Sequence, residues 1–425
     1  MSSRAVRGAT LIDGTGRDPV RNATVLIEDG RILAVGKDHK ISVPDTAEVI
    51  DAGGRTLLPG MIDCHVHVMS NPSTIERELS VPPSLALLQC IPRLQTTLNA
   101  GFTTVRDAGG APLGIKLAIE QGIIAGPRMQ VSVTALCQTG GHGDPFTPSC
   151  LLLSVPLPDV PPSVVDGVEA MRQRVRELLR AGAEWIKICT SGGVLSQTDV
   201  PSFPQYTPSE IEVAVVEARA VGKSVMAHAL GTQGIKNAIS AGVKSIEHGV
   251  WLDEEAIALM KARDVYLVPT LIAPIQVARQ SERDGAANPG RESDRVESMI
   301  DDHARSFQAA YRAGVKIATG TDSGVGPHGE NAEELALMVN SGMSPMDAIV
   351  SATSRAAALL GVAHSLGTLE AGKVADLLLV DGDPLDNIDI LRDTTRISMV
   401  MKDGQVFKDL TNQIQNTDVL EASQA

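Results

Sequence analysis

Two histidines separated by one residue are the first feature of the sequence that could do chemistry. His65 and His67 lie in the apolar stretch 61–67, which follows the breaker pair Pro59 and Gly60 and predicts a short strand. Side chains alternate between the faces of a strand, so the two imidazoles point the same way. Neutral imidazoles side by side suit a divalent metal such as zinc. An edge strand with two partly exposed histidines would show the same pattern.

Four further residues favour the metal interpretation. His228, His248 and Asp322 each end a strand-like segment, and Lys187 lies within another. Four histidines and an aspartate at such positions indicate a ligand set rather than scattered core residues. Lys187, flanked by two isoleucines, fits an ion pair or an amine that reaches a polar surface. It equally fits a lysine carboxylated by CO₂ that bridges two metals, and composition does not choose between these interpretations.

Strands and helices alternate through the middle of the chain and would position these residues. Eight strand segments, each followed by a helical pattern, are expected at residues 61–67, 102–107, 129–133, 184–189, 224–228, 245–248, 265–269 and 315–322. The later helices are expected at residues 295–313, 330–341 and 345–360. This α/β alternation predicts a (β/α)8 TIM barrel over residues 60–365, with its active site at the C-terminal ends of the strands.

Short strands and turns, without a helical period, flank this barrel on both sides. They occupy residues 1–59 and 366–425, and we expect them to pair into one discontinuous β-sandwich module. The polar stretch from about residue 411 is expected to be loose.

Composition argues against several classes of partner. The 425 residues are 43% hydrophobic and 21% charged, as in soluble globular proteins. A net charge of −14 and an aromatic content of 2% argue against nucleic acid and membrane surfaces. Five scattered cysteines without a CxxC pair fit a reducing compartment. With no signal-peptide core in residues 1–6, we expect a cytoplasmic protein, although a trimmed N-terminus would leave a secreted origin open.

These motifs together resemble the metal-dependent amidohydrolase superfamily over nearly the whole chain. The matching segments are residues 57–60, 61–67, Lys187 in its strand, His228, 247–249, 320–323 and 367–377. Residues 103–110 and 187–193 are similar to the prolidase branch. That branch includes Xaa-Pro, Xaa-Arg and Xaa-Lys dipeptidases and ochratoxin-hydrolysing amidohydrolases, and imidazolonepropionase is a more distant relative.

The resemblance implies two divalent metal ions, which we expect to be zinc. By this resemblance the strand-end residues form three groups: His65, His67 and Asp322 for one metal, His228 and His248 for the other, and N-carboxylated Lys187 as the bridge, together with a hydroxide. Two cations lower the pKa of a bridging water, and one of them polarises the scissile carbonyl. Asp322 would take the proton from this water and pass it to the leaving amine.

Three loop residues are candidates for substrate contact. Tyr206 follows the fourth strand, and its phenol could donate to the carbonyl oxygen or developing oxyanion. His142, in a glycine-rich loop after the third strand, could reach over the metals, and His328 follows the eighth strand. Any of the three could instead be an ordinary loop residue. The loops at 145–162 and 276–295 would shape the pocket, and the prolines and leucines of the first predict an apolar wall.

Other polar residues are expected to be structural. We expect Arg106 and Asp107 to form a pair below the site. We expect His303, within a helix, and His39, in the β module, to lie on the surface.

The expected activity is hydrolysis of the amide bond of an N-acyl amino acid or dipeptide, with ochratoxin A (to ochratoxin alpha and phenylalanine) among the substrates that fit. The expected partners are a small-molecule substrate and further copies of the chain in a homo-oligomer. One alternative is deamination or cyclic-amide opening, as in imidazolonepropionase, at a mononuclear site with an unmodified Lys187. A second alternative is a non-catalytic scaffold protein, which the complete ligand set disfavours.

Overall fold

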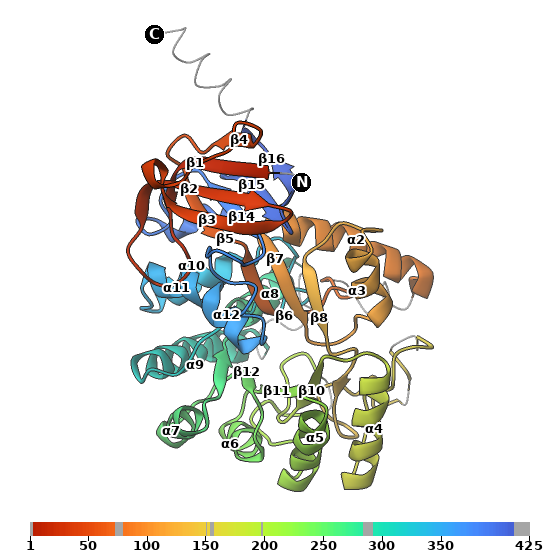
Figure 1. Cartoon of the computed structure of the whole chain (residues 1–425). Helices are drawn as coiled ribbons and strands as arrows, with labels where there is room; N and C mark the ends of the chain where they lie inside the picture. The colour runs from red at the N-terminus through yellow and green to blue at the C-terminus, as the bar shows by residue number, and fades with distance from the viewer. Residues whose placement is uncertain are drawn as a thin grey trace.

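A mixed sheet of eight strands joins the two ends of the chain in the computed structural model, which describes residues 3–72, 80–149, 151–153, 157–196, 199–283 and 292–411. Its order is β16-β15-β14-β5-β1-β2-β3, with β4 paired to β1. The strands are β1 (Ser3–Leu11), β2 (Val20–Glu28), β3 (Arg31–Lys37), β4 (Glu48–Asp51), β5 (Thr56–Pro59), β14 (Leu377–Val380), β15 (Ile397–Lys402) and β16 (Gln405–Asp409). Figure 1 shows the C-terminal strands (blue) beside the N-terminal strands (red) in this sheet, and the two groups meet where β14 pairs with β5.

Strand β1 has three neighbours because its register shifts between Val6 and Ala9. Its first half pairs in parallel with β4, and its end pairs with β5 through Thr10 and Leu11. A separate core of apolar side chains packs within this part of the chain, including Val25, Leu57, Leu377 and Met399. The sheet therefore has its own core, apart from the one that supports the ligand set.

Two parallel sheets carry the ligand set. One has the order β6-β7-β8 and the other β13-β12-β11-β10-β9. Their strands are β6 (Met61–Val66), β7 (Phe102–Asp107), β8 (Arg128–Val131), β9 (Ala135–Leu136), β10 (Trp185–Cys189), β11 (Ser224–Ala229), β12 (Ser245–His248) and β13 (Tyr266–Val268). In the parallel register Cys189 lies opposite His228, and Ala229 lies opposite His248, so the ends of neighbouring strands are level.

The segment 315–322, where a regular eighth strand was predicted, makes only isolated bridges. Ile317 bridges to Leu267 of β13, and Ser323 bridges to Val66 of β6. The N–H of Asp322 donates to the carbonyl of His65 over 2.7 Å. A Cβ at Gly320 would overlap the side chain of Val268 and crowd His65. The segment thus packs closely against Val268 of β13 and His65 of β6 and lies between these strands, although it lacks the regular hydrogen-bond ladder of a strand.

Helices follow the strands of the parallel sheets (Figure 1). They are α2 (Pro83–Asn99), α3 (Leu113–Glu120), α4 (Val168–Arg180), α5 (Pro208–Ala220), α6 (Thr232–Ala241), α7 (Glu254–Arg263), α8 (Ile272–Arg283), α9 (Glu292–Arg312), α10 (Glu333–Asn340), α11 (Pro345–Ser351) and α12 (Ser354–Leu359), with 3₁₀ turns η1 (Asp38–Lys40) and η2 (Ile388–Arg392). The single helix predicted at 345–360 is two helices, because the backbone leaves the helical region at Thr353. Of the predicted loop 276–295, residues 276–283 belong to α8 and residues 292–295 to α9, and residues 284–291 lie outside the described ranges.

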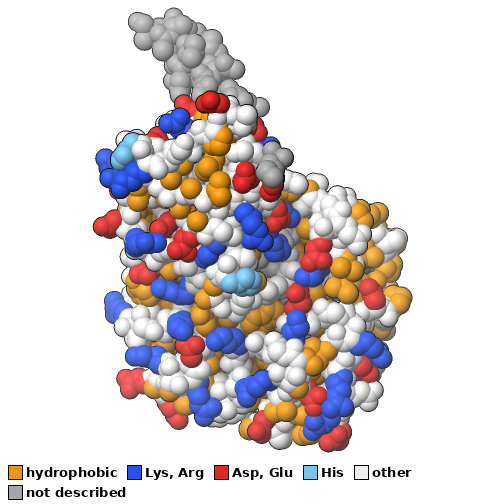
Figure 2. Space-filling model, viewed as in Figure 1, with side chains coloured by type: hydrophobic (Ala, Val, Ile, Leu, Met, Phe, Trp, Pro, Cys, Tyr) orange, Lys and Arg blue, Asp and Glu red, His pale blue; other side chains and the backbone are white. Residues whose placement is uncertain are grey.

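The face of the molecule in Figure 2 carries Lys and Arg interspersed with Asp and Glu. Neither sign forms a continuous field there, in keeping with a small-molecule site rather than a polyanion-binding surface. Within the described ranges, none of the helices combines the length and the apolar character that crossing a membrane requires.

Candidate active site

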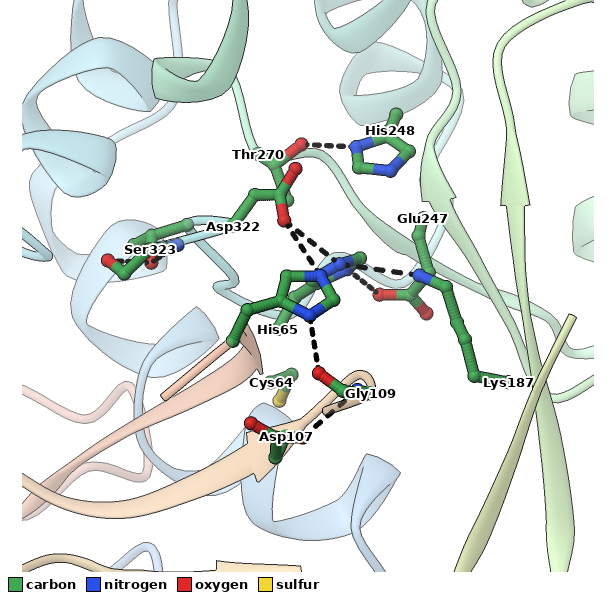
Figure 3. A network of polar contacts seen from close by, with 12 residues as sticks. Cys64, His65, Asp107, Gly109, Lys187, Glu247, His248, Thr270, Asp322 and Ser323 are labelled. Atoms are coloured by element: carbon green, nitrogen blue, oxygen red, sulfur yellow. Dashed lines mark hydrogen bonds and ion pairs between the residues drawn. The ribbon is translucent and has the colours of Figure 1, made fainter. Parts of the chain in front are cut away.

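The side chains at the ends of β6 and β12 meet at Asp322. Ligand atoms of His65, His248 and Asp322 all lie within 4.8 Å of one another. The Oδ1 atom of Asp322 is 3.3 Å from Nε2 of His65 and 3.2 Å from Nε2 of His67 (Figure 3). The HxH pair of β6 therefore presents the same nitrogen of both rings to one carboxylate oxygen.

The remaining ligand candidates join this group from β10 and β11. Nζ of Lys187 lies 3.3 Å from Nε2 of His65. The imidazole of His228 lies 4.6 Å from that of His248, centre to centre. All six residues predicted as ligands thus belong to one cluster, although His67 is only half-buried, whereas His65, Lys187, His228 and His248 are buried.

The outer nitrogens of the imidazoles are occupied, which leaves the inner nitrogens free to act as ligands. His65 Nδ1 donates to Glu247 Oε2 over 2.8 Å, and His67 Nδ1 donates to the carbonyl of Gly109 over 2.8 Å. His228 donates through Nε2 to the carbonyl of Gly192 over 3.0 Å, so its Nδ1 keeps the lone pair. Such outer hydrogen bonds fix the tautomer and orientation of a metal-binding imidazole.

His248 makes the corresponding contact with a hydroxyl. Its Nδ1 lies 2.7 Å from Thr270 Oγ1, directly after β13. His248, Thr270 and Asp322 all have positive φ angles, of 73°, 52° and 60°. Such backbone is strained for residues other than glycine and concentrates at functional sites. The fold therefore holds two of the predicted ligands in conformations that local preference would not select.

A buried carboxylate ties β6 to the Asp322 segment. Asp63 accepts hydrogen bonds from the N–H of His65 at 3.0 Å, from the hydroxyl of Thr321 at 2.6 Å and from the side-chain amide of Asn331 at 2.7 Å. Burial raises the pKa of Asp63, and these donors oppose that rise. The network fixes the first and the last ligand-bearing segments relative to each other.

Burial and neighbouring charges set the protonation of the cluster. Burial lowers the pKa of Lys187, which favours its neutral amine. Burial also takes the pKa of His228 and of His248 well below the usual range, which favours the neutral imidazoles that bind metals. Burial alone would raise the pKa of Asp322, but His65 and the hydrogen bonds of the cluster hold it well below its usual value.

A small cavity of about 70 Å³ opens beside His228, His248 and Asp322. His142, predicted to contact substrate, lines it and stacks on His228 with ring centres 4.2 Å apart. A Cβ on Gly193 would overlap the imidazole of His142, so this glycine makes room for the ring. The structure thus brings His142 to the ligand cluster.

The other two predicted substrate residues lie elsewhere. Tyr206 packs in the main core just ahead of α5, and its buried hydroxyl has no hydrogen-bond partner among the described residues. His328 is buried, and its Nε2 donates to the carbonyl of Ser70 over 3.0 Å. Neither side chain lines the cavity. Their roles in substrate contact remain predictions.

Two residues expected to be structural or superficial belong to the site's surroundings. His303 is 2% exposed rather than on the surface, lines the cavity, and donates from Nε2 to the carbonyl of His248 over 2.9 Å. Its spacing from Met299 and Phe307 on α9 places it on the buried face, a signal the sequence already carried. Arg106 pairs with Glu247 rather than with Asp107, which instead accepts backbone N–H groups of Val68 and Gly109.

Comparison with known proteins agrees with this geometry. Residues 56–407 match the model of the Amidohydrolase family. The chain is 35% identical over 419 residues to an ochratoxinase of Aspergillus niger, covering 94% of this chain and 85% of that protein. A solved structure of a Xaa-Pro dipeptidase with bound methionine aligns with a TM-score of 0.88 at 36% identity, over 96% of this chain and 100% of that one. A prolidase complexed with N-methylphosphonate-L-proline aligns with a TM-score of 0.88 at 35% identity, over the same shares. The chain therefore belongs to the amidohydrolase family and is a hydrolase that acts on amide bonds.

Proposed function

We propose that this chain is a binuclear zinc amidohydrolase that cleaves N-acyl amino acids or dipeptides. The leaving group is an amino acid with a free carboxylate. The ochratoxinase relative and the two dipeptidase structures support an N-acyl amino acid over other amides. Ochratoxin A, cleaved to ochratoxin alpha and phenylalanine, is one candidate of this class.

The observation that carries the proposal is the convergence of ligand atoms whose outer partners are already satisfied. Three histidines give their second ring nitrogens to Glu247, Gly109 and Gly192, so their remaining lone pairs face the cluster. Asp322 adds an ionised oxygen within 3.3 Å of two of them. Imidazole lone pairs and a carboxylate are the donors that zinc prefers.

By this proposal His65, His67 and Asp322 hold one ion, and His228 and His248 hold the other. N-carboxylated Lys187 would supply carboxylate oxygens to both. The lowered pKa of Lys187 supports this modification, because the neutral amine is the form that attacks CO₂. Two bound ions would lower the pKa of a water and polarise the amide carbonyl.

The residues of the chain move the protons of the reaction. Water adds to the amide carbon, and the carbon–nitrogen bond breaks to give a carboxylic acid and an amine. Asp322, ionised because His65 and His67 hold its pKa down, takes the proton of the attacking water at a carboxylate oxygen. It then delivers the proton to the leaving nitrogen. His142, at the cavity wall, contacts the substrate.

We further infer that the two parallel sheets and the segment 315–323 close into one (β/α)8 barrel over residues 60–365. Backbone bonds from Ile317 to β13 and from Ser323 to β6 support closure on one side, and the bond from Glu184 to Val131 supports it on the other. Residues 1–59 and 366–425 form the β-sandwich module. The protein acts in the cytoplasm as a homo-oligomer.

A screen of N-acyl amino acids and dipeptides with zinc-loaded protein tests the function. The wild type should hydrolyse members of this class, and Lys187→Ala and Asp322→Ala should lose the activity. Lys261→Ala and Asp386→Ala, which change the same residue types at exposed positions, should keep it. Near-full activity in either site variant would sink the mechanism. Cyclic-amide opening by protein with a single metal would instead favour the imidazolonepropionase-like alternative.

A further inference from the structure

We propose that α8 and α9 form an apolar wall that selects an uncharged, apolar group of the substrate over a cationic one. This inference rests on the proposed function and narrows its substrate class. The wall would favour apolar N-acyl amino acids over substrates that place a lysine or arginine side chain in the cavity. The ligand cluster alone does not distinguish these two kinds of substrate.

Away from the ligand cluster, the lining of the cavity is aliphatic except for His142 and His303. The aliphatic lining comes from six separate places in the chain: Val194 and Leu195 after β10, Leu230 after β11, Val250 after β12, Ala273, Pro274 and Val277 on α8, Met299 on α9, and Val325 beside Asp322. Among the described residues, the lining includes no lysine, arginine or glutamate, and Asp322 is its one carboxylate.

Asp322 is not available to a substrate cation. Its Oδ1 already lies within 3.3 Å of His65 and His67, inside the ligand cluster. A lysine or arginine entering the cavity would therefore lose its water without gaining an anionic partner. Burying an unpaired charge costs far more than burying an apolar group of the same shape, which is stabilised by contact with aliphatic carbons.

Contacts behind the wall hold it in place. On α9, His303 donates to the carbonyl of His248, and Ser306 donates to the carbonyl of Val250 over 2.6 Å. On α8, Gln276 donates to Glu330 over 2.8 Å, and Arg279 pairs with Glu333 at 2.9 Å. The polar side chains of Gln276 and Arg279 thus bond to the loop before α10 and to α10 itself, while Val277 lines the cavity.

Buried packing links α9 to the segments that follow β11 and β12. Leu230, Val250 and Met299 are each at most 6% exposed and form one cluster. The apolar surface of the cavity is therefore built before substrate arrives, and rigid preformed walls discriminate better than walls that must reorganise.

Two pairs of near-isosteric substrates test the wall. The first pair varies the leaving group: Nα-acetyl-norleucine and Nα-acetyl-lysine. The second varies the acyl group: hexanoyl-alanine and 6-aminohexanoyl-alanine. We expect kcat/KM of zinc-loaded wild type to favour the uncharged member by at least about tenfold in the pair whose variable group enters the cavity. Ratios below about threefold in both pairs would overturn the wall and leave the amidohydrolase function standing.

A designed carboxylate sharpens the test. Val277→Glu places a carboxylate in the half-buried lining, and it should raise kcat/KM for the cationic member and lower it for the apolar one. Ala309→Glu adds the same group on an exposed position of α9 and should change neither. An unchanged preference in folded, zinc-loaded Val277→Glu would overturn the assignment of the wall. If wild type cleaves no amide of either pair or of the wider screen, the proposed function fails and takes this inference with it.

Discussion

Arg106 and Glu247 form a buried ion pair directly behind the imidazole of His65. Nη2 of Arg106 lies 2.9 Å from Oε1 and 3.0 Å from Oε2 of Glu247, and both side chains have no exposed surface. The guanidinium also lies 4.5 Å from the ring centre of Trp185. Burial would raise the pKa of Glu247, but Arg106 and His65 lower it to about 2. The carboxylate therefore stays charged and holds His65 Nδ1 as a donor.

Glu247→Gln should weaken zinc binding by about 10- to 100-fold, because the neutral amide holds His65 less firmly in its tautomer. Zinc affinity is measured by competition with a chelator, on protein shown to be folded by circular dichroism. Glu254→Gln, the same change at an exposed position on α7, should bind zinc like the wild type. Unchanged affinity in folded Glu247→Gln would contradict a positioning role for this carboxylate.

The recovery of activity when zinc is returned to metal-free protein should depend on bicarbonate. Burial lowers the pKa of Lys187, which favours the neutral amine that reacts with CO₂. Protein stripped of metal and CO₂ should regain activity with zinc faster, and to a higher level, when bicarbonate is supplied. Lys187→Gln should show no bicarbonate response. Equal recovery of wild-type activity with and without bicarbonate would argue against the carboxylated lysine.

Gly193→Ala should displace His142 from the ligand cluster, because the new methyl group would occupy the space of the imidazole. We expect a loss of about 100-fold in kcat/KM, the effect of shifting a contact group by about 1 Å. Gly114→Ala is the matched control, since a Cβ there meets no atom within 4 Å. A fully active Gly193→Ala enzyme would show that the position of His142 is unimportant for catalysis.

Glu334 should make stability fall as the pH rises. Burial raises its pKa to about 8, although it accepts the N–H groups of Leu271 and Ile272 over 2.8 and 2.9 Å. An acid with a folded pKa above its unfolded value holds more protons in the folded state. Its stabilising contribution is thus complete below the unfolded pKa of about 4.3 and disappears as the pH rises through about 8.

The free energy of unfolding in urea, measured from pH 5 to pH 8, tests this role. Glu334→Gln should flatten the decline, while costing some stability at every pH because an NH2 group, which is a donor, replaces one of the two oxygens that accept backbone N–H groups. Glu282→Gln, at an exposed position of α8, should keep the wild-type slope. An identical slope in Glu334→Gln and wild type would rule Glu334 out as its source.

Sequence patterns located most of the cluster because its residues sit at strand ends. His228 and His248 follow apolar runs, and the parallel register places neighbouring strand ends at one level. The segment before Asp322 was harder to predict, because its residue pattern is that of a regular strand. The close approach of Gly320 to Val268 and His65, which makes the segment irregular, depends on tertiary packing.

The surroundings of the cluster depend on partners far apart in sequence. Arg106 was expected to pair with its neighbour Asp107, yet it reaches Glu247 on another strand. Side chains of adjacent strand residues point to opposite faces. Asp107 was therefore a poor candidate for the partner of Arg106. His303 was expected at the surface, but its spacing from Met299 and Phe307 places it on the buried face of α9. Val277 of the cavity wall lies on α8, within the segment 276–295 that was expected to be a loop, whereas Met299 lies in the helix predicted at 295–313.

The pairing of β5 with β14 affects the order in which the protein can fold on the ribosome. Leu57 lies opposite Leu379, so this part of the sheet cannot assemble until more than three hundred further residues have been synthesised. During that time the edge of β5 has no partner, and exposed strand edges invite pairing with other chains. Expression at lower temperature, or with a chaperone that covers exposed strands, should therefore increase the yield of correctly assembled protein.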